Sequence, residues 1–178
     1  SLRQPMVRTL AEMRTMVDET LALMRDEVAL EDTVEVSLRE LLDQLIAENA
    51  ARHHDVAWQT LPQTDFPYRC RPVALKRAFS NILDNAIRHG GKARLAIRHG
   101  DHANGRPAIT VVIDDDGPGL PADCSGQVSG NGVGLANTRE RLKVLYGARQ
   151  RVEVRSRPAE AGGGVEVALE LPFETRSD

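Results

Sequence analysis

The sequence has little of what several classes of protein depend on. It contains two cysteines in 178 residues, too few for a disulfide framework. Three Phe, two Tyr and one Trp are too few for a base-stacking surface, and a net charge of −3 gives no support to a general nucleic-acid binder. No apolar run approaches the roughly 18 residues of a membrane span, and no signal peptide is recognisable. We therefore expect a soluble, cytoplasmic, mixed α/β protein that contacts neither nucleic acid nor membrane.

Residues 1–30 are expected to form one long helix. Apolar residues recur at helical spacing from Met6 to Val28, and charged residues occupy the other face. Either this helix folds back on its own domain, or it forms a bundle with another chain. We favour the second alternative, which predicts a homodimer through the helix. The change of pattern places a domain boundary between residues 30 and 31, so that residues 31–178 form a second domain.

Residues 31–178 alternate between strand and helix patterns. Ser37, with Glu40 three residues later, predicts a capped helix start, and Pro72 predicts a second one. Gly90 and Gly91 are expected to end the second helix, whose predicted buried face is Val73, Leu75, Phe79, Ile82, Leu83, Ala86 and Ile87. A third helix is expected over 135–146, ending at Gly147. Strands are expected at 33–36, 56–60, 68–70, 93–97, 109–113, 152–154 and 165–171, with 100–105 as a polar loop.

A polar face on the second helix is the first candidate site. Asn81, Asn85 and Arg88 are spaced by four and three residues, so they share this face, with His89 beside it. An amide oxygen can ligate Mg²⁺ without adding charge, which suits a metal already carried by phosphates. An ordinary solvated helix face would look the same.

An acidic turn that follows the strand at 109–113 is the second candidate site. Asp114, Asp115 and Asp116 precede Gly117 and Gly119. An ionised carboxylate accepts hydrogen bonds and cannot donate them, so it could bind the exocyclic amine of adenine and reject the carbonyl of guanine. The glycines allow a flat ring to approach the backbone.

A glycine-rich segment at the start of the third helix is the third candidate site. Gly130, Gly132 and Gly134 precede Leu135, and N–H groups at a helix N-terminus can bind an anion. No Lys-Ser/Thr pair follows, so the segment is not a P-loop. The dipole alone contributes about 0.3–1 kcal/mol per charge. Mg²⁺ and basic side chains such as Arg88 and Lys92 would have to supply the rest.

The order of these three motifs resembles the catalytic ATP-binding domain of sensor histidine kinases. This domain belongs to the wider Bergerat group, with type II topoisomerases, ninety-kilodalton chaperones and mismatch-repair proteins. The N box resembles 81–85, the G1 box 115–119 and the G2 box 130–135, and the resemblance covers about 31–172. It implies a two-layer α/β sandwich with a mixed sheet and helices on one face. Residues 1–30 are similar to the second helix of the dimerisation and phosphotransfer hairpin.

The resemblance also implies a reaction and roles for particular residues. The intact parent would transfer the γ-phosphoryl group of ATP to a histidine, for relay to the receiver domain of a response regulator. Asn85 would ligate Mg²⁺ and Asn81 would support the phosphates, both as catalytic residues. Asp115 would accept from the adenine amine, between Gly117 and Gly119. The residues implied near the phosphates are Gly130, Gly132, Gly134 and Leu135, with Arg88, His89 and Lys92 around the triphosphate.

Three departures from the family pattern keep alternatives open. None of the five histidines lies where the phosphoacceptor is expected, so the chain looks like a fragment of a longer kinase. The segment 120–129 would be a reduced ATP lid, and Val165 stands where the family often has Thr. An anti-sigma-type serine kinase and an interaction module without catalysis are the alternatives. Related hydrolases often carry a general-base Glu at the position of Asn81, so we expect hydrolysis to be slow or absent.

The remaining histidines and the cysteines are expected to have no chemical role. His53, His54, His99 and His102 are predicted to be solvated rather than metal ligands. No histidine or acidic relay accompanies either cysteine in the sequence, so a cysteine nucleophile is not expected.

Overall fold

The computed structural model describes residues 30–65, 67–101, 105–120 and 133–173. The expected N-terminal helix of residues 1–30 lies outside this part of the chain, except for Leu30. In chain order the elements are β1 (Val34–Ser37), α2 (Leu38–Ala51), β2 (Asp55–Trp58), β3 (Pro67–Cys70), α3 (Pro72–His89), β4 (Lys92–Asp101), β5 (Pro107–Asp115), α4 (Val133–Tyr146), β6 (Arg151–Ser156) and β7 (Val165–Pro172), with short 3₁₀ turns at Gly147–Arg149 and Ala159–Ala161. No helix among the described residues is both long and apolar enough to cross a membrane.

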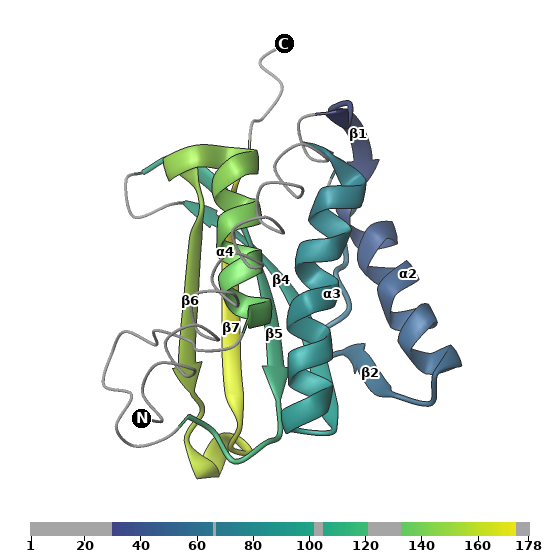
Figure 1. Cartoon of the computed structure of the whole chain (residues 1–178), viewed down its shortest axis with the longest axis vertical. Coiled ribbons are helices and arrows are strands. Elements are labelled where there is room, and N and C mark those ends of the chain that lie inside the picture. Colours follow the sequence, from purple (N-terminus) through teal and green to yellow (C-terminus); the bar gives the residue numbers. More distant parts are fainter. Residues whose placement is uncertain (1–29, 66, 102–104, 121–132, 174–178) are drawn as a thin grey trace, which may run out of the picture.

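A five-stranded mixed sheet is the centre of the fold. Its strand order is β2-β4-β5-β7-β6 (Figure 1). β2 pairs with β4 in parallel, and the other three pairs are antiparallel. β1 and β3 form a separate antiparallel pair. The expected α/β class and mixed sheet are confirmed.

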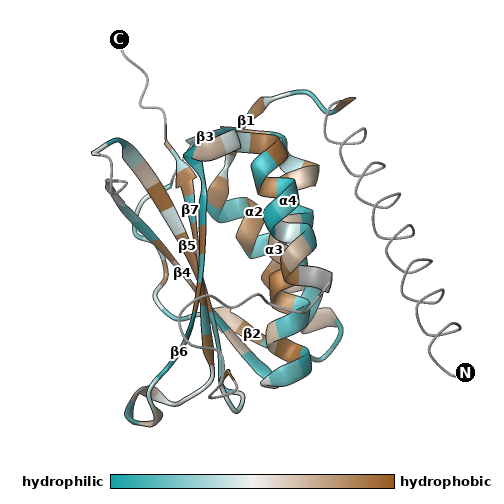
Figure 2. Cartoon of the chain, turned by 60° about the vertical axis from the view of Figure 1, so that its left-hand side comes forward, coloured by the Kyte–Doolittle hydropathy of each residue, from teal (hydrophilic) through white to brown (hydrophobic). Residues whose placement is uncertain are grey.

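The helices cover one face of the sheet, as expected (Figure 2). The core lies between the two layers, where α3 contributes the fully buried Phe79 and Leu83 and α4 contributes Leu142. β5 and β7 contribute Ile113 and Leu169 from the sheet. Among the described residues, the hydrophobic cluster buried on the opposite face is small and consists of Ala96, Val112 and Ala168. Most of the apolar side chains are therefore buried between the sheet and the helices.

The helix starts agree with the sequence pattern. Ser37 is the N-cap of α2, and its Oγ accepts a hydrogen bond of 3.0 Å from the N–H of Glu40. Pro72 is at the start of α3, where its missing N–H leaves no helix bond unmade, and Gly90 follows the last residue of that helix. Gly147 follows α4 with φ +60°. Capping residues were therefore reliable signals in this chain.

Several expectations need correction. β4 extends to Asp101, so Gly100 and Asp101 belong to a long strand rather than to a loop. The strand expected over 56–60 ends at Trp58. Val73 was expected to be buried but is 56% exposed, because it lies in the first turn of α3, beyond the edge of the packed layer.

Candidate functional site

A cavity of about 390 Å³ lies between the sheet and the helices α3 and α4. Its polar groups come from Asn85 and His89 of α3 and from Asp115 at the end of β5. Pro118, Gly119 and Leu120 border it after β5. The apolar walls are Ile82, Ile113, Leu135, Val154, Val165 and Val167. The cavity can therefore enclose a flat apolar group that also has polar atoms on its edge.

Strand alternation gives Asp114 and Asp115 opposite environments. Successive side chains of β5 point to opposite faces of the sheet, so Asp115 lies on the helix-covered face with Ile113. Asp114 lies on the other face with Val112. Only Asp115 reaches the cavity. The alternation of side chains along β5 is therefore enough to place one of these two neighbouring carboxylates at the cavity and the other on the opposite face of the sheet.

Two backbone N–H groups hold the carboxylate of Asp115, which is 8% exposed. Its Oδ1 accepts hydrogen bonds from Gly117 N at 2.9 Å and from Val165 N at 3.0 Å. Both donors bond the same oxygen and come from different segments, one after β5 and the other at the start of β7. The orientation of the carboxylate is therefore fixed by the fold.

Close backbone packing explains two of the glycines. A Cβ on Gly117 would lie 2.7 Å from the backbone oxygen of His89, and one on Gly90 would lie 2.9 Å from the Cβ of Asp115. The C-terminal end of α3 therefore packs directly on the turn after β5. Gly119 has φ +83°, a conformation that glycine adopts at little cost. The segment 117–119 is therefore supported by the C-terminal end of α3.

The turn before β7 belongs to the site, which the sequence indicated only through Val165, the position where the family often has Thr. The composition of 159–164 suggested only a flexible turn. In the structure Gly164 lies against Asp115, and the next residue, Val165, both donates to the Asp115 carboxylate and lines the cavity. The sequence signal for this close contact was Gly164 followed directly by the apolar strand pattern at 165–171.

Arg157 ties this turn to β5. Its Nη1 donates to the backbone oxygen of Asp115 at 3.3 Å, and its Nη2 donates to that of Ala161 at 2.5 Å. Its Nε lies 4.0 Å from Oδ2 of Asp114. Burial raises the pKa of the Asp114 carboxyl, and Arg157 opposes that shift. Arg157 therefore supports the Asp115 backbone from outside the cavity.

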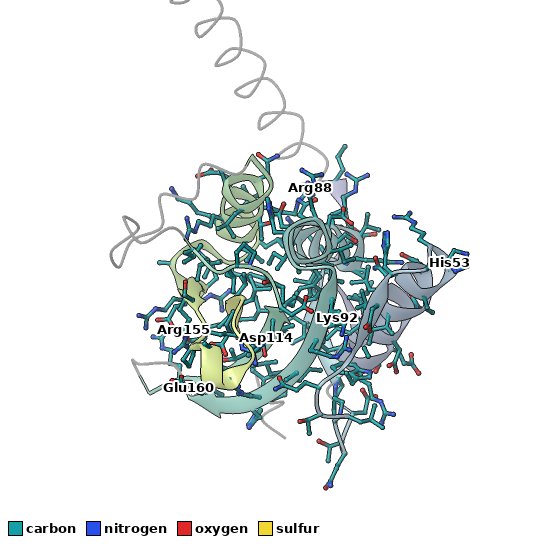
Figure 3. The ribbon with its side chains drawn as sticks, turned by 90° about the horizontal axis from the view of Figure 1, so that it is seen from below. His53, Arg88, Lys92, Asp114, Arg155 and Glu160 are labelled. Carbon is teal, nitrogen blue, oxygen red and sulfur yellow. The ribbon has the colours of Figure 1, made fainter. Side chains whose placement is uncertain are left out.

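The N-box asparagines and the nearby residues expected around the triphosphate lie at different distances from the cavity. Asn85 and His89 line it, whereas Asn81 is half-buried one turn earlier and is not in its wall. Arg88 is exposed and points away from the sheet (Figure 3). Lys92 is also exposed, and its backbone N–H donates to Oδ1 of Asp116 at 3.1 Å. The structure thus brings Asn85 and His89 together with Asp115, and places Arg88 and Lys92 outside the cavity wall.

The expected phosphate-binding glycines lie at the edge of the described chain. Gly130 and Gly132 fall outside the described residues. Gly134 is in the first turn of α4, and Leu135 is buried and lines the cavity. The N-terminal end of α4 is therefore at the cavity, where its N–H groups could meet an anion.

The remaining histidines and cysteines are described only in part, since His102 and Cys124 lie outside the described residues. Among the described residues no group of three or more His, Cys, Asp and Glu side chains could hold a metal ion. Burial raises the pKa of the Cys70 thiol to about 12, so the reactive thiolate is disfavoured. His99 stacks edge-on against Phe173, with ring centroids 5.2 Å apart.

Comparison with known proteins agrees with this geometry. The family model for histidine kinase-, DNA gyrase B- and HSP90-like ATPases matches residues 70–175, more than half of the chain. The chain belongs to this ATPase family. Within the family it is the ATP-binding catalytic domain of a sensor histidine kinase.

The chain is similar to individual sensor histidine kinases at low sequence identity. The sensor histidine kinase GtrS of Pseudomonas aeruginosa is 29% identical over 182 residues, which covers 96% of this chain and 36% of GtrS. The sensor-type histidine kinase PrrB of Mycobacterium tuberculosis is 26% identical over 154 residues, 80% of this chain and 32% of PrrB. The chain therefore spans about a third of the length of these relatives.

Solved structures share the fold. The ATP-binding domain of PrrB from Mycobacterium tuberculosis superposes with a TM-score of 0.61 at 27% identity, covering 82% of this chain and all of that one. The histidine kinase AdeS of Acinetobacter baumannii gives a TM-score of 0.64 at 16% identity, over 95% of this chain and 81% of that one. At that identity AdeS supports the fold alone.

Proposed function

We propose that this domain binds MgATP with its adenine ring in the 390 Å³ cavity and that Asp115 selects adenine. The observation that carries the proposal is the fixed carboxylate. Both N–H donors bond Oδ1 of Asp115, which leaves Oδ2 for the exocyclic amine of adenine. A carboxylate at that position would repel the carbonyl oxygen of guanine. The apolar walls from α3, α4 and β7 suit the faces of the ring.

Asn85 fits the role of a Mg²⁺ ligand. It is a neutral amide in the wall of the cavity, on the same side as His89, and Mg²⁺ carried by phosphates needs few protein ligands. When bound, the ion would neutralise charge on the phosphates. Gly130, Gly132 and Gly134 are the proposed phosphate-binding residues, with Arg88, His89 and Lys92 nearby and Leu135 beside the ring. Asn81 is proposed to support the phosphate side one turn earlier in α3.

The reaction proposed for the parent protein is transfer of the γ-phosphoryl group to a histidine outside this chain. The phosphate would then pass to a receiver domain of a response regulator. Phosphoryl transfer depends mainly on positioning and charge stabilisation, so the domain needs to hold ATP and to exclude water. Asn81 cannot act as a general base, so we propose that hydrolysis is slow.

The proposed division of the chain follows from the same resemblance. Residues 1–30 would belong to a dimerisation and phosphotransfer hairpin and residues 31–178 to the ATP-binding domain. The parent would be a homodimer, either free or anchored in the bacterial inner membrane, with this domain in the cytoplasm.

Calorimetric titration tests the nucleotide site directly. MgATP and MgGTP are titrated into the wild-type chain, Asp115→Asn and Asp116→Asn. Asp116 is exposed and outside the cavity, and the amide oxygen of an Asn there can still accept from Lys92 N, so Asp116→Asn matches the charge change while keeping that contact. We expect MgATP binding that is selective over MgGTP, that survives in Asp116→Asn and that is lost in Asp115→Asn. Equal binding of both nucleotides, or equal loss in both variants, would refute the role of Asp115.

If the wild-type chain binds neither nucleotide, the interaction module without catalysis is favoured.

To test the reaction, the full-length parent is incubated with γ-labelled ATP. Acid-labile, base-stable phosphate on the protein is expected of phosphohistidine, whereas acid-stable phosphate would favour the serine-kinase alternative.

A further inference from the structure

The N-terminal end of α3 is capped by a residue far away in the sequence. Oε1 of Glu31 accepts a hydrogen bond of 2.6 Å from Val73 N, and Oε2 accepts one of 2.9 Å from Ala74 N. The N-cap residue of this helix, Arg71, makes no side-chain capping bond, and Pro72 has no N–H to offer. Glu31 therefore satisfies two of the free N–H groups at this end, and its negative charge suits the positive end of the helix.

Glu31 lies where the chain enters the described domain. It follows Leu30, the first described residue, and precedes β1, which pairs with β3 in the register Val34 to Cys70. β3 continues through Arg71 into α3. The small β1–β3 sheet lies at one end of the helical layer (Figure 2). The entering chain and the first turn of α3 are therefore joined twice, by strand pairing and by the carboxylate cap.

The other end of α3 forms part of the nucleotide cavity. Asn85 and His89 line the cavity, and Gly90 packs against Asp115. At 1.5 Å per residue, the 18 residues of α3 span about 27 Å. One helix thus connects the Glu31 cap to the site proposed for MgATP.

A second contact links the same small sheet to α4. The ring of Tyr68 in β3 lies 6.4 Å from that of Tyr146, the last residue of α4, and the Tyr68 hydroxyl donates to the backbone oxygen of Pro172 at 3.0 Å. Leu135 at the other end of α4 lines the cavity. Tyr68 of the β1–β3 sheet thus contacts the far end of α4, and Glu31, just before β1, contacts the far end of α3.

We propose that Glu31 is a positioning residue that couples the segment preceding the domain to the nucleotide helix. Displacement of that segment would withdraw the carboxylate, leave Val73 N and Ala74 N uncapped and loosen the first turn of α3. Binding of MgATP at the other end would in turn stabilise α3 and its cap, because coupling between two sites is reciprocal. The coupling rests on the proposed MgATP site, whereas the cap itself does not.

Amide hydrogen exchange of the 178-residue chain tests the cap and the coupling separately. Exchange at Val73 and Ala74 is followed by NMR with and without MgATP in wild type, Glu31→Ala, Glu31→Gln and Asp32→Ala. Asp32 is the adjacent exposed acid, so its variant has the same change of charge without loss of the cap. Leu42 in α2 reports whether a variant is destabilised as a whole.

Without nucleotide, we expect exchange at Val73 and Ala74 to be about five- to tenfold faster in Glu31→Ala, the size expected when a helix cap is lost. The exchange rates in Asp32→Ala should match those of wild type. The rates in Glu31→Gln should lie between those of wild type and Glu31→Ala, since its amide oxygen can accept one bond. MgATP should slow this exchange in wild type and not in Glu31→Ala. The affinity for MgATP should fall about threefold in Glu31→Ala, a modest part of a typical coupling.

Three outcomes would overturn the coupling. Wild-type exchange rates in Glu31→Ala would show that the cap does not act in solution. Faster exchange that MgATP still slows as much as in wild type would show a merely structural cap. A wild-type chain that binds no MgATP would refute the proposed function and the coupling with it, while exchange without nucleotide would still decide the cap. If exchange at Leu42 is also faster in Glu31→Ala, that variant is destabilised as a whole. The cap is then tested by comparing exchange at Val73 and Ala74 in Glu31→Gln and Asp32→Ala, which should be faster in Glu31→Gln.

Discussion

Gly164 lies against Asp115 so closely that a Cβ on Gly164 would be 2.0 Å from the Asp115 backbone oxygen. Gly164 also has φ +87°, which side-chain-bearing residues rarely adopt. This contact places Val165, whose N–H bonds the carboxylate of Asp115 at 3.0 Å. The glycine turn before β7 therefore helps to hold the carboxylate that we assign to adenine.

Replacing Gly164 should damage the nucleotide site. In Gly164→Ala the methyl group and the strained φ must displace either the turn or Asp115, so we expect the MgATP affinity to fall more than about tenfold, given a strain of roughly 1–3 kcal/mol at such sites. Calorimetry measures the affinity, and circular dichroism checks that the variant is folded.

Gly100→Ala is the control for that substitution. A Cβ at Gly100 in β4 would meet no atom within 4 Å, and Gly100 is absent from the residues with positive φ. Its affinity should equal that of wild type. Similar loss in both variants, or no loss in Gly164→Ala, would contradict the role of the turn.

Asn85 should contribute to binding of the phosphates with Mg²⁺ and little to binding of the ring. Asn85→Ala is therefore expected to weaken MgATP about tenfold or more, the order of one charge-assisted contact, and to leave adenosine affinity within about twofold of wild type. Asp84→Ala changes an exposed neighbour on α3 and serves as the control. Equal weakening of MgATP and adenosine would place Asn85 against the ring instead.

The pH dependence of stability should reveal the buried Asp114. It is 3% exposed, and burial raises the pKa of its carboxyl, while Glu166 and Asp115 add to the shift and Arg157 and Arg98 oppose it. The folded state therefore holds this proton more tightly than the unfolded chain, whose Asp pKa is about 3.9. The stability that the neutral carboxyl contributes is complete below pH 3.9 and is lost as the pH rises through the raised pKa.

Asp114→Asn removes this dependence. The difference in unfolding free energy between variant and wild type should shift in favour of the variant from pH 4 to pH 7. Urea denaturation at several pH values measures it, with the exposed Asp116→Asn as control. A difference that does not change with pH would show that folding does not raise the pKa of Asp114.

Local signals in the sequence were sufficient for most of the fold. Ser37 and Pro72 marked helix starts, and Gly90 and Gly147 marked helix ends, because each satisfies a local backbone requirement. The parallel pairing of β2 with β4 was not foreseen, since strand partners are chosen by packing across the whole sheet. The exposed Val73 was misjudged for a similar reason, because helical spacing does not show where the packed layer ends.

The candidate site divides in the same way. Asp115, Gly117 and Gly119 stood together in a short motif, and the structure brings them to one place. The contribution of Glu31 depends on a contact across 42 residues of chain, which no local pattern indicates. That of Gly164 depends on a contact across 49 residues, for which a glycine just before a strand pattern was the sole local signal. Sequence motifs thus indicated residues that line the cavity, whereas the structure was needed for the residues that hold them in place.

The core beneath α3 should determine the stability of the domain. Leu83 is fully buried on the sheet-facing side of the helix that carries Asn85. Leu83→Ala removes buried methyl groups and leaves a cavity, so it should lower the unfolding free energy by about 2–5 kcal/mol. Leu61→Ala makes the same chemical change at a residue that is 54% exposed, and it should change stability by less than about 0.5 kcal/mol. Urea denaturation can be followed through Trp58, the only tryptophan, whose Nε1 donates to Oδ1 of Asp43 at 2.7 Å and links β2 to α2. Comparable losses in the two variants would mean that the α3 layer is not packed on the sheet as described, and the position of Asn85 at the cavity would then have no support.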